Sequence, residues 1–211
     1  MRRTTAAGAC LVLLLVFVLS AYTFRAPILA AAGHLLVVAD PVASADIIVI
    51  AIDAKEAGVL EAADLFHQGV APRVGVFTDL PTDMDLELIR RGAPFFDEAT
   101  QFIEQLGALG VTCIERLPPA VSGTKEEGDV LRGWLGQHRF RSIVVVTSSD
   151  HSRRVSRVLR RALQGQSFIL IVKPSSYSAF DPEHWWQSRE NLRTGIIELQ
   201  KLLLDVVLHP M

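Results

Sequence analysis

Short apolar runs alternate with amphipathic helical patterns along most of the chain, and this alternation constrains the fold more than any other feature. The runs are rich in β-branched residues without polar alternation, as expected of strands buried on both faces. They cover residues 46–52, 73–78, 111–115, 142–147 and 167–173, with helical patterns at 54–68, 95–109, 124–138 and 152–163 and a short turn expected near 83–90. We predict an α/β fold: a three-layer Rossmann-like domain with a mostly parallel sheet of about five strands.

A further helical pattern ends the chain. Asp181 can cap a helix and Pro182 suits the first helical position, so we predict that the last helix begins there. Trp185 and Trp186 follow, and residues 195–209 are apolar over much of the helical circumference. Packing against the domain is the preferred interpretation, and contact with a bilayer surface is the alternative.

The first 25 residues have the composition of a membrane anchor. Arg2 and Arg3 precede Ala6–Phe24, which is uncharged and would rise roughly 28 Å as a helix, close to the hydrocarbon thickness of about 30 Å. We predict one uncleaved N-terminal transmembrane helix (1–25), a juxtamembrane connector (26–45) and an exported α/β domain (46–211), because basic residues before an apolar run stay in the cytoplasm. A signal peptide cleaved near Ala32 is the alternative.

Charge and cysteine content narrow the possible partners. Beyond residue 25 the chain holds 18 basic and 23 acidic residues, which argues against nucleic acid and suits a small anion near a local arginine cluster. The only cysteines are Cys10, within the apolar segment, and Cys113, so no disulfide framework is predicted. Cys113 is expected to be a buried strand residue.

Polar residues follow the predicted strands, at the edge where open parallel sheets bind ligands. Those of the first three strands are Asp53, Thr78, Asp79, Glu115 and Arg116; those of the last two are Ser148, Ser149, Asp150, His151, Lys173, Ser175 and Ser176. We predict that residues 147–150 cap the helix of 152–163 and that His151 and Arg154 are neighbours in its first turn. A titratable ring beside a guanidinium predicts an anion site. The other arginines of this helix, Arg153, Arg157, Arg160 and Arg161, are predicted to form a solvated face.

The loop before residue 124 predicts a second anion-binding element. Ser122 or Thr124 is expected to cap the following helix, whose free N–H groups and dipole attract anions. A metal site built from Asp53, Asp79, Asp150 and His151 is a weaker alternative, and no metal is assigned. The chain lacks a nucleophile elbow, a Walker loop, a zinc-binding pair and a glycine-rich dinucleotide fingerprint.

Several motifs occur together in an order typical of one family. A basic start and an anchor are followed by a helix ending in Gly69-Val70-Ala71-Pro72, by a loop with Ser122, Thr124 and Glu126, and by Thr147-Ser148 before His151-x-x-Arg154. This order resembles the SanA/YdcF/ElyC-like family, bacterial envelope-associated domains of unknown function. The chain departs from the family pattern where glycines usually follow the first two strands, at Glu127 in place of an asparagine, and at Asp150 in place of an aromatic residue.

The resemblance implies a single-pass protein of the bacterial inner (cytoplasmic) membrane, with its C-terminal domain on the periplasmic side. It also implies a role in cell-envelope integrity, peptidoglycan biogenesis or lipid-carrier homeostasis. Our leading hypothesis is that a phosphorylated or otherwise anionic metabolite, such as a lipid-carrier phosphate, binds this domain. The predicted ligand-binding residues are Asp53, Ser122, Thr124, Glu126, Ser148 and Arg154, and His151 is predicted to donate or accept a proton. The alternatives are a ligand-free, non-catalytic envelope scaffold and a nucleotide- or S-adenosylmethionine-binding module. No cofactor or oligomeric state is predicted.

Overall fold

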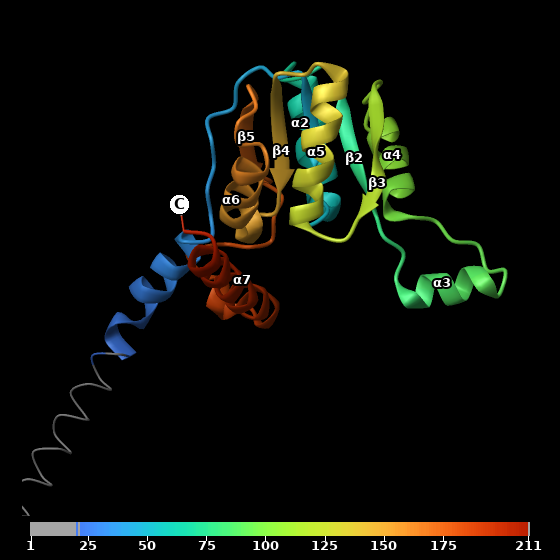
Figure 1. Ribbon diagram of the computed structural model, residues 1–211. Coiled ribbons are helices and arrows are strands. Elements are labelled where there is room, and N and C mark those ends of the chain that lie inside the picture. Colours follow the sequence, from blue (N-terminus) through green and yellow to red (C-terminus); the bar gives the residue numbers. More distant parts are fainter. Residues whose placement is uncertain (1–19, 21, 211) are drawn as a thin grey trace, which may run out of the picture.

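A five-stranded, entirely parallel sheet forms the centre of the molecule (Figure 1), in a computed structural model that describes residues 20 and 22–210. The strands are β1 (Ile47–Ile50), β2 (Val74–Asp79), β3 (Ile114–Val121), β4 (Ser142–Thr147) and β5 (Ile169–Pro174), in the order β3-β2-β1-β4-β5. The predicted Rossmann-like α/β class is confirmed. Because successive connections move outward in opposite directions from β1, the topological switch point lies between β1 and β4.

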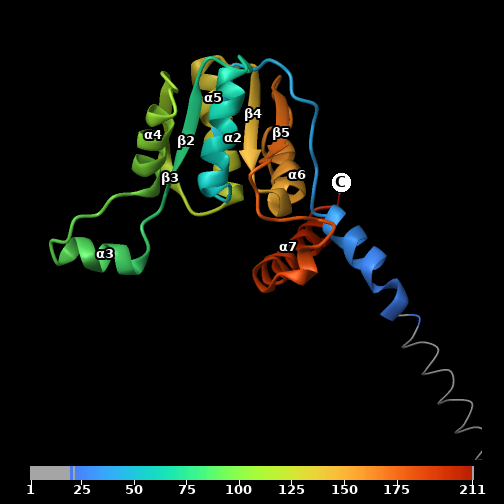
Figure 2. The ribbon, with the colours of Figure 1, turned by 180° about the vertical axis from the view of Figure 1, so that it is seen from behind.

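Helices cover both faces of the sheet and form the predicted three layers. One face carries α2 (Lys55–His67) and α4 (Glu98–Ala108), and the other carries α5 (Thr124–His138) and α6 (Ser152–Ala162) (Figures 1 and 2). The helices that lie outside these layers include α3 (Asp83–Arg90), which contains no buried residue, α7 (Arg189–Leu208) and a helix formed by residues 22–34.

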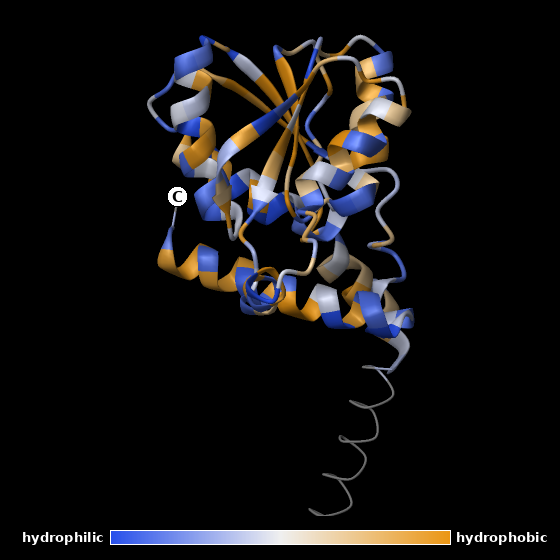
Figure 3. Cartoon of the chain, turned by 90° about the vertical axis from the view of Figure 1, so that its right-hand side faces the viewer, coloured by the Kyte–Doolittle hydropathy of each residue, from blue (hydrophilic) through white to orange (hydrophobic). Residues whose placement is uncertain are grey.

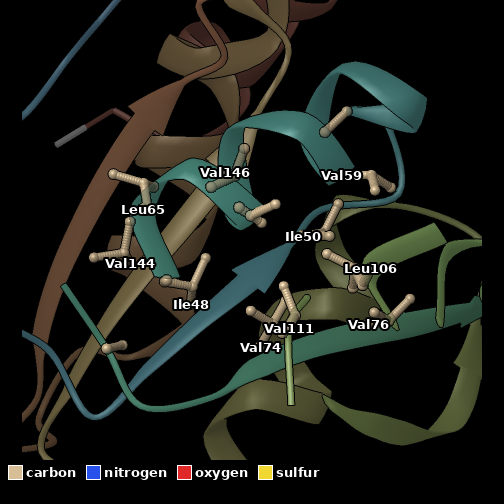
Figure 4. Close-up of a cluster of buried hydrophobic side chains, with 14 of the residues drawn as sticks. Ile48, Ile50, Val59, Leu65, Val74, Val76, Leu106, Val111, Val144 and Val146 are labelled. Atoms are coloured by element: carbon tan, nitrogen blue, oxygen red, sulfur yellow. The ribbon is translucent and has the colours of Figure 1, made fainter. Parts of the chain in front are cut away.

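The central strands are apolar where both faces are covered, over all of β1 and over residues 143–146 of β4. Ile48 and Ile50 pack into the cluster beneath α2 and α4 (Figure 4), whereas Ile47 and Val49 pack against α5 and α6. Successive strand residues point to opposite faces, so the middle of a strand between two helical layers is apolar, and the polar residues Ser142 and Thr147 lie at the two ends of β4.

The third strand differs from its predicted bounds. It begins at Ile114, near the end of the expected segment, and continues through Pro118 and Pro119 to Val121. This strand pairs only with β2, and an edge strand tolerates proline because one side of its backbone makes no ladder bonds. Local sequence signals therefore indicated a loop where the chain forms an edge strand.

This shift moves three residues away from their expected places. Glu115 and Arg116 lie near the start of β3, not after its carboxyl end; Glu115 lies 2.6 Å from Arg73, and Arg116 lies 2.7 Å from Asp97. Cys113 is half-buried and precedes the strand. These residues stabilise the sheet edge and do not join the predicted ligand site.

The predicted start of the last helix is also wrong. Asp181 accepts a hydrogen bond from the Glu183 N–H in a local turn, and the helix starts seven residues later, capped by Ser188. In between, Trp185 is buried with Leu36 and Phe180 in a third apolar cluster. Burial of the Trp185 indole therefore holds this segment in place, and α7 begins only after it.

The prediction that the last helix packs against the domain is confirmed for only part of the surface of α7. Gly195 and Glu198 are its buried residues, whereas much of the remaining apolar surface is exposed: Ile196, Ile197, Leu203, Leu204, Val206, Val207 and Leu208. In Figure 3 the helix that leads to the C-terminus accordingly shows both orange and blue bands.

The N-terminal part of the described chain packs against the same region. Residues 22–34 are helical, and the Leu29 carbonyl accepts a 2.7 Å hydrogen bond from the Trp185 indole. Residues 1–19 and 21, which hold most of the predicted transmembrane segment, lie outside the described residues. Among the described helices, none combines the length and apolarity needed to cross a bilayer.

Candidate functional site

Polar side chains meet at the switch point, where β1 and β4 end. Asp53, in the turn after β1, accepts three hydrogen bonds on Oδ2: from the Thr147 hydroxyl at 2.6 Å, the Ser148 N–H at 2.9 Å and the Ser148 hydroxyl at 3.0 Å. These bonds join the carboxyl ends of the two strands, at the place where ligands bind in this class of fold.

The predicted capping of α6 by residues 147–150 is wrong. A 3₁₀ turn (Ser149–His151) precedes the helix, and no side chain caps either element. The Thr147 and Ser148 hydroxyls instead bind Asp53. A hydroxyl donating to a carboxylate makes a charge-assisted bond, which is stronger than a bond between neutral groups.

His151 lies between two carboxylates. Its Nδ1 atom is 3.1 Å from Asp150 and 2.9 Å from the Ser148 hydroxyl, and its Nε2 atom is 3.1 Å from Glu198. Burial works to lower the pKa of the ring, but the hydrogen bonds to Asp150 and Glu198 outweigh it and raise the pKa to about 10. At neutral pH the ring is therefore an imidazolium and does not accept a proton.

Glu198 brings α7 into the site. This carboxylate is 1% exposed and also binds Arg154 at 2.7 Å and Lys201 at 2.7 Å. Burial opposes its ionisation, yet the neighbouring cations, His151 first, lower its pKa to about 2. Glu198 is not among the residues predicted for the site. In the sequence, the only indication is that an acidic residue lies three positions after Gly195, on the buried side of an otherwise apolar helix.

The structure brings His151 and Arg154 together through Glu198, which binds both. Arg154 also donates to the Thr124 hydroxyl at 3.1 Å. Three helices therefore meet at this guanidinium, because Arg154 comes from α6, Glu198 from α7 and Thr124 from α5.

A second buried carboxyl, Glu127, lies on the first turn of α5 and was also missed. It is 1% exposed, and its Oε1 atom accepts the Ile52 N–H at 2.7 Å. Burial, followed by the charge of Asp53, raises the pKa of Glu127 to about 8. Leu131 and Leu135 follow four and eight residues later on the buried face of α5. This helical spacing could have indicated that Glu127 is buried too.

The start of α5 differs from the predicted arrangement. Neither Ser122 nor Thr124 caps the helix; Gly123 occupies the cap position without a side-chain bond. The N–H and hydroxyl of Ser122 instead donate to Glu126 at 2.6 and 2.8 Å, and both residues are exposed. Lacking a side-chain cap, the first N–H groups of α5 remain a site of positive potential beside Arg154.

Two carboxyl oxygens in this region are buried without a hydrogen-bond partner among the described residues. They are Oδ1 of Asp53 and Oε2 of Glu127. Buried polar atoms are nearly always satisfied in folded proteins, and an unsatisfied one costs about 1–3 kcal/mol. We define the switch-point site as Asp53, Thr124, Glu127, Ser148, His151, Arg154 and Glu198.

The other polar strand ends bind different partners. Asp79 lies 3.5 Å from Lys55, Lys173 lies 3.0 Å from Glu61, and the Ser175 hydroxyl donates to a carbonyl of α2. Within the described part of the chain, no three His, Cys, Asp or Glu side chains are arranged to hold a metal ion. The proposed convergence of acids on a metal does not occur there.

The remaining arginines of α6 are not an ordinary solvated face. Arg157 and Arg161 both bind Asp205 of α7 at 2.7 Å, and Arg160 binds an aspartate of the connector at 2.7 Å. Arg153 donates to three backbone carbonyls of the connector. These side chains attach α7 and the connector to α6, which sequence spacing could not reveal.

Comparison of the sequence with models of known protein families gives no match, and comparison with curated proteins gives none either.

Proposed function

We propose that this protein is a membrane-anchored, extracytoplasmic domain of the SanA/YdcF/ElyC-like type that binds a phosphorylated cell-envelope metabolite in the switch-point site. The carrying observation is the pair of buried carboxyl oxygens on Asp53 and Glu127 that lack partners. A ligand that donates a hydroxyl or amide hydrogen to Asp53 and accepts the proton of Glu127 in a second hydrogen bond would remove the free-energy cost of leaving these oxygens unpaired.

The same site has groups suited to a phosphate. The uncapped first turn of α5 presents N–H groups and the positive end of the helix dipole. Arg154 lies beside that turn through its bond to Thr124 and can pair with phosphate oxygens. Carboxyls on one side and an anion-binding helix start on the other favour a phosphorylated compound that also carries hydroxyl or amide groups, such as a sugar phosphate or a lipid-carrier derivative.

Proton transfer at this site is assigned to Glu127. With a pKa of about 8 it keeps its proton at neutral pH and can release it within the physiological range. His151, held as an imidazolium between two carboxylates, orients Glu198 and supplies positive charge. This assignment changes the role expected for His151.

Ligand binding is tested on the full chain in detergent micelles by titration calorimetry with inorganic phosphate, a nucleoside diphosphate, S-adenosylmethionine and a polyprenyl phosphate. We expect saturable binding of a phosphorylated probe, weakened roughly tenfold or more by Arg154→Gln because a charged hydrogen bond contributes about 1.5–3 kcal/mol. Lys201 and His151 still neutralise Glu198 in that variant. Glu104→Gln, an exposed change on α4, is the matched control.

Each contrary result supports a different alternative. No binding of any probe would overturn the proposal in favour of a ligand-free scaffold. Binding of S-adenosylmethionine alone would support a nucleotide-type module. Equal phosphate affinity in Arg154→Gln and the wild type would exclude this site.

The membrane anchor is tested separately. Alkaline extraction should leave the full chain in bacterial inner membranes. A purified protein whose mass corresponds to a chain that starts near Ala32 would refute the anchor.

A further inference from the structure

A groove between α6, α7 and the connector lies outside the switch-point site. It encloses about 1130 Å³ and is lined by Leu35 and Val38 of the connector and by Leu202, Leu203 and Val206 of α7. Pockets for small molecules measure about 300–1,000 Å³, so this groove can accommodate a large apolar group. We propose that the groove binds one anionic phospholipid of the bilayer, with an acyl chain inside the groove and the headgroup beside the arginines that line it.

The charge around the groove favours an anionic headgroup. Arg153, Arg157, Arg160 and Arg161 contribute to its lining. Two carboxylates pair with them, those of Asp205 and of a connector aspartate, which leaves an excess of two positive charges. Arg160 and Arg161 are the more exposed members, with 51% and 37% of their side chains accessible, and can turn toward a phosphate without unpacking.

The position of the groove favours a lipid over other occupants. Leu35 directly follows the helix formed by residues 22–34, and Figures 1 and 2 place that helix beside α7. The predicted anchor (residues 1–25) runs into the start of this helix, so the groove lies on the side of the domain from which the chain would enter the bilayer; this step rests on the proposed membrane anchoring. Leu203 and Val206 of the lining are themselves exposed, so the apolar wall of the groove is open to solvent on its α7 side.

Two other occupants fit the charges less well. A second copy related by two-fold symmetry would bring two arginine clusters together, and like charges at an interface oppose association. The chain's own residues 1–19 begin with Arg2 and Arg3 and contain no acid, so they offer no counter-charge. A phospholipid with a phosphate and an acyl chain satisfies both the arginines and the apolar wall.

The first test compares lipid retention by the full chain in detergent micelles, using native mass spectrometry after addition of phosphatidylglycerol or phosphatidylcholine. We expect retention of one phosphatidylglycerol, favoured about 30-fold over phosphatidylcholine, the preference that two basic side chains near an anionic lipid provide. Arg160→Gln/Arg161→Gln should abolish this preference. Arg90→Gln/Arg91→Gln, an equally charged and more exposed pair at the end of α3, should retain it.

The second test addresses the apolar wall. Leu203→Asn/Val206→Asn changes two exposed groove residues and should weaken retention of both lipids, whereas Leu204→Asn/Val207→Asn alters α7 outside the lining and should not. Equal loss in both pairs, equal retention of the two lipids, or a dimer mass in place of a lipid adduct would each overturn the proposal. Displacement of phosphatidylglycerol by inorganic phosphate would also overturn it, by assigning the site to free phosphate. Glu127→Gln should leave lipid retention unchanged, which separates this proposal from the switch-point function.

Discussion

Replacement of Glu127 by glutamine tests whether the buried carboxyl makes stability depend on pH. Its pKa is raised from 4.5 to about 8, first by burial and then by the charge of Asp53. Between these pH values the folded protein holds a proton that the unfolded chain has released. The free energy of unfolding therefore falls as pH rises through this interval, because ionising the folded carboxyl is unfavourable.

The structure sets the size of the effect. At about 1.4 kcal/mol for each pH unit, the loss between about pH 5 and about pH 8.5 is ~4 kcal/mol. Glu127→Gln removes the titration while its amide oxygen can still accept the Ile52 N–H. The stability advantage of the variant over the wild type should therefore grow by ~4 kcal/mol across that pH range.

The assay is urea unfolding of the full chain in micelles, followed by tryptophan fluorescence at both pH values. The free energy of unfolding of Glu104→Gln, on the exposed side of α4, should differ from that of the wild type by the same amount at both pH values. Titration of His151 affects wild type and variants alike and so cancels in the difference. A stability difference for Glu127→Gln that is the same at both pH values would refute the reasoning.

Three further predictions concern packing and charge; urea unfolding measures the first two, and hydrogen exchange measures the third. Glu198→Gln leaves the buried imidazolium and guanidinium without their shared carboxylate and should destabilise the protein by about 3–5 kcal/mol, whereas the exposed change Glu190→Gln should shift it by less than about 0.5 kcal/mol. A Cβ at Gly195 would lie 2.5 Å from the Trp185 indole, so Gly195→Ala should destabilise by about 1–3 kcal/mol; Gly133→Ala, with no atom within 4 Å of its Cβ, should stabilise by about 0.5–1 kcal/mol. Asp205→Asn weakens two ion pairs and should increase hydrogen exchange in the C-terminal half of α7; unchanged exchange would show that these pairs do not hold it.

The local pattern predicted several elements with correct bounds. β4 spans residues 142–147 and α5 spans 124–138, as expected from apolar runs and helical periodicity, whereas residues 83–90 form the helix α3 where only a short turn was predicted. These signals are reliable where a strand is buried on both faces or a helix presents one apolar side. The third strand was predicted with the wrong bounds because an edge strand has an exposed side, and Pro118 and Pro119 resembled a loop.

The sequence by itself determined that Asp53, Ser148 and His151 follow strands whose carboxyl ends meet, since a parallel α/β sheet places those ends on one edge. Only the tertiary structure decided what these residues bind. Glu198 joins Arg154 from 44 residues away in the chain, and Glu127 is buried against the end of β1. The pKa of a carboxyl depends on its burial and on charges within a few ångströms, and both are set by packing between elements distant in sequence.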